Sequence, residues 1–274
     1  ITQQEMYSFS KNLYKKVFLE GFVYGDFNEA DAKKTLSVFK KRTGAKEIKK
    51  DQVFELDFLK QKNAEDIQYV DVLRVNNSCF WREYELGNDS PNIRASALLI
   101  SQAVQQPFYT EMRTNQQLGY IVWSRSVDRD ETHYMNFAIQ SGEYPADDLN
   151  RRAGDFIATL PEFIRGMDTE KFAQLKNSVI EQLEREPKSI SERANKLKDF
   201  VFEHNADFER DIKTISSIKE VDKNYLADLF FNTINKESRK MVTNIMFAKQ
   251  HKNKQNLRSS FEDIEKWKKS RVYR

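Results

Sequence analysis

The sequence predicts an α+β domain of two layers, in which helices cover one face of a mixed, mainly antiparallel β-sheet. Three observations carry this prediction. Strand-like and helix-like segments are interspersed along the chain, the helix-like segments place their apolar residues along one stripe, and most strand-like segments alternate apolar with polar residues. A helix with one apolar stripe and a strand with one apolar face each bury that side against a neighbour. Two packed layers follow.

Composition supports a folded chain with a substantial core. The 274 residues exceed an average domain, and 39% of them are hydrophobic against 32% charged. Twenty Phe and eleven Tyr supply large apolar surfaces that can be buried under a strongly charged exterior. We therefore expect one large domain together with a fragment of another.

The pattern changes along the chain divide it into three parts. Residues 1–50 read as the closing strand and helix of a preceding homologous repeat, followed by a linker. The strand is expected in the run V-F-L-E-G-F-V-Y-G-D, and the helix over residues 29–41, with Ala32, Leu36 and Phe39 on one stripe and Gly44 at its end. Residues 51–250 form the last α+β repeat, and residues 251–274 form a basic tail.

The elements of the large repeat follow from periodicity and capping residues. Ser90 and Pro91 supply a helix N-cap and a first-turn proline, Pro107 should kink or weaken that helix near Gln106, and Asp168 can cap a later helix. Strands are expected at about residues 53–58, 79–86, 118–127, 132–141 and 241–247. Helices are expected at about residues 91–108, 145–164, 168–186, 189–203 and 222–231.

The formal charge of +3 is unevenly distributed. Residues 249–274 hold nine Lys or Arg against three acidic residues, so this segment is about +6 and the remainder about −3. A basic segment can attract nucleic acid or an anionic lipid surface, yet no nucleic-acid recognition motif accompanies it. We therefore expect a solvated chain end and no nucleic-acid partner.

No stretch of the sequence is long and apolar enough to predict a membrane span, and no secretory signal precedes the first strand. A soluble protein is expected. Because the sequence begins at Ile1 and not at Met, we interpret it as a processed product or an excised fragment. Periplasmic and cytoplasmic locations both stay open.

Most familiar catalytic arrangements are missing from the sequence. Cys79 is alone, which excludes an intrachain disulfide and a Cys-based zinc site. His133, His204 and His251 are isolated, so none belongs to the H-x-x-E-H pattern of an inverted zinc peptidase. Neither a G-x-S-x-G turn nor a phosphate-binding glycine loop is present. We predict no catalytic residue and no metal ligand in this chain.

Residues 113–120, which we call the octet, read R-T-N-Q-Q-L-G-Y and lie between an expected helix and an expected strand. Arg113 offers five N–H donors that can hold peptide carbonyls or a developing oxyanion, and the Tyr120 hydroxyl can donate to the same region. The structural alternative is an exposed Arg113 paired with Glu111 and a Tyr120 that fills the core beside Trp123.

The octet resembles the R-T-x-x-Q-L-G-Y segment in the C-terminal half of insulin-degrading-enzyme and pitrilysin-type zinc metallopeptidases, also called the insulinase family. Other segments of the chain are similar to that half in the same order. They are E-G-F-V-Y-G at 20–25, V-N-N-S-C at 75–79, Q-P-F-Y-T-E-M-R at 106–113, E-P-K-S-I-S at 186–191 and D-F-E-R-D at 207–211.

This resemblance implies a zinc-dependent endopeptidase that encloses peptide substrates between two bowl-shaped halves. It implies that zinc is bound by the N-terminal half, absent here, and that this chain alone is inactive. Arg113 and Tyr120 would bind substrate from across the chamber. Tyr109 would form an aromatic wall near the scissile bond, where the family more often has Phe.

Two other interpretations stay open at this stage. One is a catalytically inactive family member that acts as a peptide-binding or assembly subunit, and the other is a standalone peptide-binding module. The expected partners are peptide substrates and an N-terminal catalytic half, in the same polypeptide or as a separate subunit. The sequence leaves open whether the chain forms a homo-oligomer.

Overall fold

A computed structural model describes residues 1–53 and 56–273. The chain divides into two units. The first unit contains Ile1–Asp57 and Glu186–Phe208, and the second contains Phe58–Arg185 and Glu209–Arg274. The second unit holds the large sheet and the octet, so it is the part that positions the candidate site.

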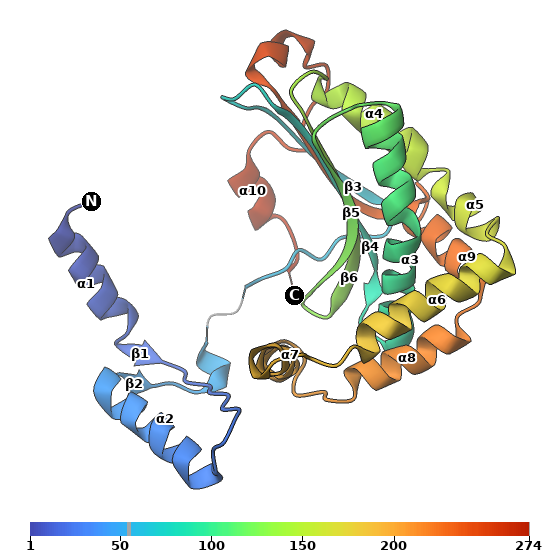
Figure 1. Ribbon diagram of the computed structural model, residues 1–274. Helices are drawn as coiled ribbons and strands as arrows, with labels where there is room; N and C mark the ends of the chain where they lie inside the picture. The colour runs from blue at the N-terminus through green and yellow to red at the C-terminus, as the bar shows by residue number, and fades with distance from the viewer. Residues whose placement is uncertain (54–55, 274) are drawn as a thin grey trace. The chain divides into compact units, whose positions relative to one another are not determined.

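A five-stranded sheet forms the centre of the second unit (Figure 1). Its strands lie in the order β3-β7-β4-β6-β5; only β3 and β7 pair in parallel, and the other neighbours are antiparallel. The expected mixed, mainly antiparallel sheet is confirmed. The strand bounds are β3 (Glu65–Val72), β4 (Ser78–Asn88), β5 (Ile121–Arg129), β6 (Thr132–Ser141) and β7 (Lys240–Phe247).

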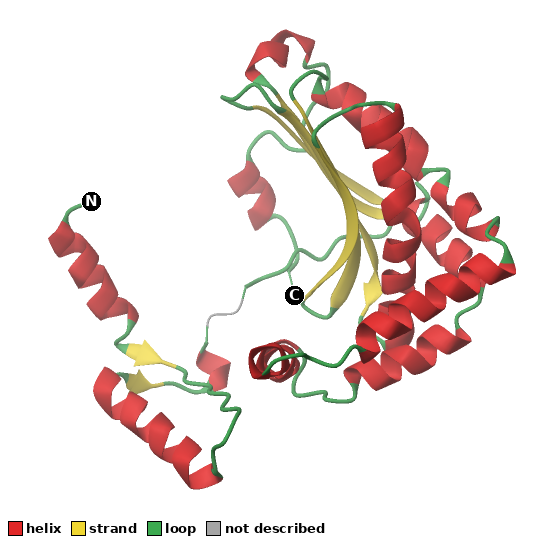
Figure 2. Cartoon of the chain, viewed as in Figure 1, coloured by secondary structure: helices red, strands yellow, loops and turns green. Residues whose placement is uncertain are grey.

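Helices gather on one face of this sheet, and one short helix lies on the other side (Figures 1 and 2). The helices on the covered face are α3 (Pro91–Tyr109), α4 (Ala146–Ile157), α5 (Leu160–Arg165), α6 (Thr169–Glu184), α8 (Arg210–Glu220) and α9 (Lys223–Ile234). The short helix on the other side is α10 (Ile264–Lys269), which follows the 3-10 helix Lys249–Lys254. The predicted two-layer α+β fold is confirmed.

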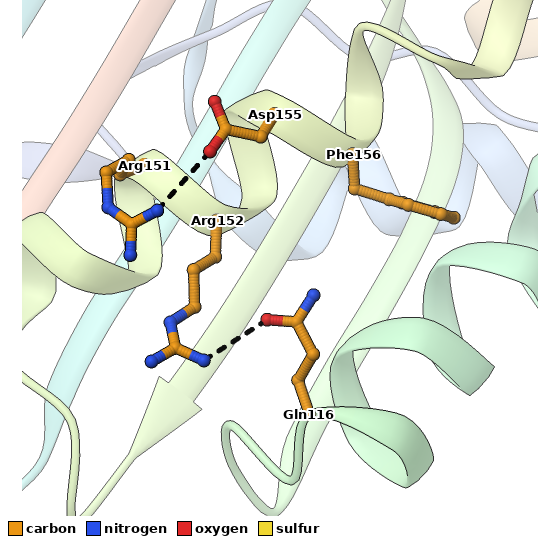
Figure 3. Close-up of a pocket in the computed structure, with 5 residues that line it drawn as sticks. All are labelled: Gln116, Arg151, Arg152, Asp155 and Phe156. Carbon is orange, nitrogen blue, oxygen red and sulfur yellow. Dashed lines mark hydrogen bonds and ion pairs between the residues drawn. The ribbon is translucent and has the colours of Figure 1, made fainter.

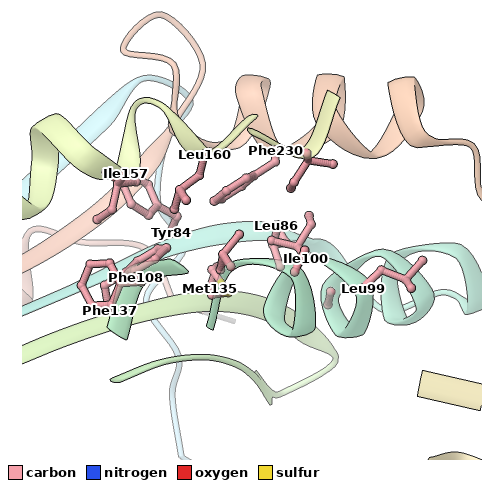
Figure 4. Close-up of a cluster of buried hydrophobic side chains, with 14 of the residues drawn as sticks. Tyr84, Leu86, Leu99, Ile100, Phe108, Met135, Phe137, Ile157, Leu160 and Phe230 are labelled. Atoms are coloured by element: carbon pink, nitrogen blue, oxygen red, sulfur yellow. The ribbon is translucent and has the colours of Figure 1, made fainter. Parts of the chain in front are cut away.

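The core lies between the sheet and these helices. Figure 4 shows side chains of α3, α4, α5 and α9 meeting those of β4 and β6. The rings of Phe108 and Phe137 are fully buried and meet edge to face, with centroids 5.0 Å apart. Each large side chain buried in this way contributes about 1.5–3 kcal/mol through the hydrophobic effect. The core therefore fixes α3 on the sheet, and α3 leads directly into the octet.

Several local signals produce the structure that they predict. The Ser90 hydroxyl accepts a hydrogen bond from the backbone N–H of Ile93, and the Asp168 carboxylate accepts one from the N–H of Lys171. The hairpin between β5 and β6 turns through Asp130 and Glu131, both with positive φ, of 46° and 53°. Such a two-residue turn matches the twist of the flanking strands.

The first strand expected in the large repeat is wrong for its described residues. Phe54 and Glu55 of that prediction lie outside the described residues, while residues 56–58 are not in a strand. The edge strand of the sheet is β3, further along the chain. Its sequence predicts a strand poorly because only Ile67 and Val70 are buried in it. Edge position leaves most of its other side chains partly exposed.

The helices differ from the prediction in two places. The helix expected over residues 145–164 is two helices, α4 and α5, separated by Ala158 and Thr159. Helix α8 was not predicted at all. Its inward residues are Thr214 and Ile218, so its apolar stripe is narrow. A short helix with one buried large apolar side chain gives a weak periodic signal.

In the first unit, the helix expected over residues 29–41 is present and ends at Gly44, whose φ of 59° is left-handed. The long strand expected before it is wrong, because only Lys16–Val17 is a strand there. A strand extends only where a neighbour completes its hydrogen bonds, and β2 pairs with just two residues. The elements are α1 (Gln3–Leu13), β1 (Lys16–Val17), α2 (Glu29–Thr43), β2 (Lys46–Glu47), a 3-10 helix (Lys50–Gln52) and α7 (Ile190–Glu203).

The basic tail is folded against the sheet, contrary to the expected solvated chain end. The Ser260 N–H donates to the Gln68 carbonyl at 2.7 Å, which covers the outer edge of β3. The Phe261 ring stacks between Tyr69 and Trp267, with centroids 5.9 and 4.7 Å away. The charge count misled because these aromatic residues and the β3 edge together provide enough contact to order the tail.

Candidate functional site

The octet begins inside a rare helical turn. Helix α3 continues past Pro107 to Tyr109 and then widens into a π-helix over Thr110–Asn115. The backbone N–H of Gln116 donates to the Glu111 carbonyl five residues earlier, at 2.9 Å. The irregularity expected near Gln106 therefore falls a few residues later. A π-helical turn is uncommon and often occurs at functional sites.

The second half of the octet is fixed by its backbone. Gln117 has a left-handed φ of 54°, which reverses the chain after the π-helix. Gly119 lies against β6 so closely that a Cβ there would be 2.0 Å from the Gln140 carbonyl oxygen. Only glycine fits this position without a displacement of the chain. The glycine of the octet is thus required by packing.

Arg113 and Tyr120 are brought together across this turn. The Arg113 Nη1 donates to the Gly119 carbonyl at 2.6 Å, and its guanidinium lies 4.9 Å from the centre of the Tyr120 ring. Arg113 is partly buried, while Tyr120 is 83% exposed. The ring therefore does not fill the core, and the structural alternative for Tyr120 is wrong.

The other part of that alternative, an ion pair between Arg113 and Glu111, is also wrong. The two carboxylate oxygens of Glu111 accept hydrogen bonds from Asn115 Nδ2 and Gln116 Nε2, each at 2.8 Å. These bonds hold the pKa of Glu111 below its usual value. Glu111 thus stabilises the π-helical turn through Asn115 and Gln116, and Arg113 bonds instead to Gly119 near the end of the octet.

Tyr109 is the last residue of α3 and is 41% exposed. Among the described residues, no hydrogen bond or ring contact joins Tyr109 to Arg113 or Tyr120. It lies four residues before Arg113 in continuous helical structure, so the two residues are neighbours along the same surface. Its role as an aromatic wall stays a prediction.

A cavity of about 370 Å³ lies beside the octet. Figure 3 shows Gln116 of the octet on one side and residues of α4 on the other. The Arg152 Nη1 donates to the Gln116 side-chain oxygen at 3.4 Å, and Arg152 Nε donates to Asp148 at 2.9 Å. The lining residues are Gln116, Arg151, Arg152, Asp155 and Phe156.

The histidines have structural positions. The His133 Nε2 donates to the Asp89 carboxylate, 2.7 Å away, and His251 Nδ1 lies 3.1 Å from the Ser78 hydroxyl. His204 is the C-cap residue of α7. Within residues 1–53 and 56–273, no three His, Cys, Asp or Glu side chains cluster as metal ligands would. The residues described here do not fit a zinc site.

Burial raises the pKa of the Cys79 thiol, so this half-buried residue of β4 is mostly protonated at neutral pH. That protonation state does not suit a nucleophile. No helix in the described part of the chain has the length and apolar character needed to cross a membrane.

The chain is similar in sequence to known proteases. Residues 99–198, which include the octet and α4, match the sequence family described as PQQ synthase PqqF-like, C-terminal lobe domain 4. Protease 3 of Escherichia coli strain K12 is 27% identical over 242 residues, which is 85% of this chain and 24% of that protein. The chain thus spans about a quarter of the length of the curated relatives that it matches.

Solved structures show the same fold. The crystal structure of pitrilysin matches all of this chain and 30% of its own, with a TM-score of 0.83 and 22% identity. An inactive peptidase domain from Pseudomonas fluorescens matches 89% of this chain and 57% of its own, with a TM-score of 0.57 and 14% identity.

The chain therefore has the fold of pitrilysin, and the curated proteins that it resembles are proteases. More particularly, the chain is similar to proteins of the insulinase family, among them Protease 3 and the insulin-degrading enzyme of Drosophila melanogaster, and the family model that it matches describes a C-terminal lobe domain.

Sequence reasoning proposes Arg113, Tyr120 and Tyr109 as substrate-binding residues, but it does not predict the residues that support the octet. Gln116 and Gly119 lie inside the quoted motif, and their roles depend on contacts with α4 and β6. Arg152 lies 36 residues beyond Gln116 in an ordinary charged helix face. No sequence signal distinguishes it from the adjacent Arg151.

Proposed function

We propose that this chain is the C-terminal part of a zinc-dependent endopeptidase, which encloses peptide substrates and completes an active site whose zinc is bound by the N-terminal half. Arg113 and Tyr120 hold the peptide, and Tyr109 forms a wall of the same site. The observation that carries the proposal is an arginine fixed at a structured turn beside a tyrosine that is 83% exposed.

The chemistry of Arg113 suits this task. A guanidinium has five N–H donors and stays charged at every relevant pH. The hydrogen bond to Gly119 and the adjacent ring fix its direction, so less side-chain entropy is lost when a peptide binds. A peptide carbonyl or a developing oxyanion can accept from the remaining donors, and the Tyr120 hydroxyl can donate beside it.

The protein is tested with its N-terminal half present, fused or as a separate chain, by hydrolysis of a quenched fluorescent peptide. Arg113→Ala and Tyr120→Phe should each lower kcat/KM by about 10²–10³-fold, which is typical for removal of one oriented donor. Arg125→Ala is a matched control, because Arg125 is exposed and lies 4.7 Å from the Trp123 ring on the adjoining strand. A loss of less than about threefold in both test variants would contradict the assignment.

A second function is favoured by one observation, the similarity to an inactive peptidase domain. In that case the chain is a catalytically inactive family member that binds peptides or supports assembly. Peptide hydrolysis by the N-terminal half, measured with and without this chain, separates the two functions. Hydrolysis that requires the wild-type chain supports the peptidase, whereas association of the two halves with no gain in hydrolysis supports the binding or assembly subunit.

A further inference from the structure

A hydrogen bond from Arg152 joins helix α4 to the octet. The Arg152 Nη1 donates to the side-chain oxygen of Gln116, and Gln116 is the residue that follows the π-helical turn (Figure 3). Gln116 in turn donates through Nε2 to Glu111, which lies in the first turn of the π-helix. A continuous series of hydrogen bonds therefore runs from α4 to the turn that carries Arg113.

Arg152 is itself held in place by two other groups. Its Nε donates to Asp148 Oδ2 at 2.9 Å, one helical turn earlier, and its guanidinium lies 5.2 Å from the centre of the Tyr144 ring. Asp148 also accepts from Arg151 Nη2 at 2.6 Å. Partial burial raises the pKa of Asp148, but the hydrogen bonds from Arg152 and Arg151 outweigh it and keep the pKa below its usual value. Asp148 is therefore an ionised acceptor at neutral pH.

The π-helical turn that these residues support depends on tertiary contacts for its stability. A π-helix has poor intrinsic stability, and here it is followed at once by Gln117 in a left-handed conformation. Two contacts fix the octet to the scaffold on either side of Gln117. Gly119 packs on the β6 backbone, and Gln116 bonds to Arg152. The first contact fixes the end of the octet and the second fixes its middle.

We propose that Arg152 is a positioning residue for Arg113: through Gln116 and Glu111 it holds the π-helical turn in the conformation that directs the Arg113 guanidinium to the peptide. This inference rests on the proposed function of Arg113. Arg152 touches no substrate in this scheme. Lysine cannot replace it, because one ammonium group cannot bond Asp148 and Gln116 in the fixed directions of a guanidinium.

The test is a double-mutant cycle on peptide hydrolysis, measured with the N-terminal half present. Arg152→Ala and Arg152→Lys should each lower kcat/KM about tenfold, since small displacements of an oriented group reduce rates strongly. The loss should fall in the same parameter, kcat or KM, that Arg113→Ala lowers. In the Arg113→Ala background, Arg152→Ala should cause less than about a twofold further loss, because its effect acts through Arg113.

Two more variants keep the result interpretable. Arg165→Ala is the control, because Arg165 pairs with Glu162 and Asp228 on the surface of α5 and α9, away from the octet. Asp155→Ala tests the cavity itself, since Asp155 lines it and pairs with Arg151, outside the series of hydrogen bonds from Asp148 to Glu111. If Asp155→Ala matches the loss of Arg152→Ala, the cavity acts by binding ligand directly and the positioning role is overturned.

Additive losses in the double variant would also overturn the inference, because a merely structural effect of Arg152 would not depend on Arg113. The failure of the proposed function is distinct. In that case Arg113→Ala alone leaves hydrolysis unchanged, whatever Arg152→Ala does. A loss with Arg113→Ala but none with Arg152→Ala rejects the positioning role and keeps the proposed function.

Discussion

The polar groups at the two ends of helix α3 differ in burial and in how many protein partners they have. At its start, Asp89 accepts hydrogen bonds from Arg94, Arg210 and His133 at 2.7 to 3.2 Å, and the three donors are largely buried. At its end, Arg113 is held by one carbonyl and one ring, and its neighbour Tyr120 is exposed. The same core helix joins both clusters.

The comparison separates polar groups that stabilise the fold from polar groups that our proposal assigns to peptide binding. The donors around Asp89 are directed at a protein carboxylate, so few of them are left for a ligand. At the octet, the exposed phenol of Tyr120 and the guanidinium of Arg113, which has one hydrogen bond, contribute little to the stability of the fold. Polar groups with few protein partners can still bond to a ligand. The variants below test this contrast between the Asp89 cluster and the octet.

The largest effect is expected from Asp89→Ala. The substitution leaves Arg94, Arg210 and His133 clustered without their carboxylate, which should lower the free energy of unfolding by about 3 kcal/mol. Denaturant unfolding measures it. Asp228→Ala, which removes an exposed pair with Arg165, should change the same quantity by less than about 0.5 kcal/mol. Equal effects in the two variants would remove the contrast between buried and exposed clusters.

Gly119→Ala should have the next largest effect. The added Cβ would overlap the Gln140 carbonyl, so the octet must move at a cost of about 2 kcal/mol, with loss of peptide hydrolysis. Gly142→Ala is the matched control, because its Cβ would meet Asn77 at 3.5 Å, an ordinary contact. Thermal unfolding and peptide hydrolysis of both variants check this, and a stable, active Gly119→Ala would show that the octet tolerates displacement.

Acid should weaken the Asp89 cluster. Burial raises the pKa of Asp89, but hydrogen bonds from His133 and Arg210 and the charge of Arg94 outweigh it, so the folded pKa lies below the usual 3.8. The stability from this carboxylate is therefore complete above about pH 4 and is lost as the pH falls through the folded value. The gap in unfolding free energy between wild type and Asp89→Asn should shrink below that pH in urea titrations. A gap that stays constant down to pH 3 would contradict the cluster's role.

The smallest stability effect is expected at the octet. Arg113→Ala removes one hydrogen bond and one cation–π contact at a partly buried site beside the exposed Tyr120, and should cost less than about 1 kcal/mol in unfolding free energy. Its effect on hydrolysis should be far larger than this stability change. If unfolding and hydrolysis fall in proportion, the octet is a structural turn and its likeness to a binding site is misleading.

Particular elements show how far sequence reasoning reached. The caps at Ser90 and Asp168 and the alternation in β7 were predicted, since each depends on residues a few positions apart. Strand β3 and helix α8 were missed, because each places few large apolar residues toward the core. The tail was misjudged because its order comes from contact with a strand about 190 residues earlier in the chain.

At the site, the residue types and their spacing follow directly from the sequence: an always charged Arg113, a phenol at Tyr120, and a glycine between them at Gly119. Only the tertiary structure decided how they act together. The π-helical turn, the approach of Gly119 to β6 and the contact of Arg152 with Gln116 all join residues that are distant in the chain or depend on backbone geometry. Local periodicity carries no information about such contacts, because they arise only when the packed core brings α3, α4 and β6 together.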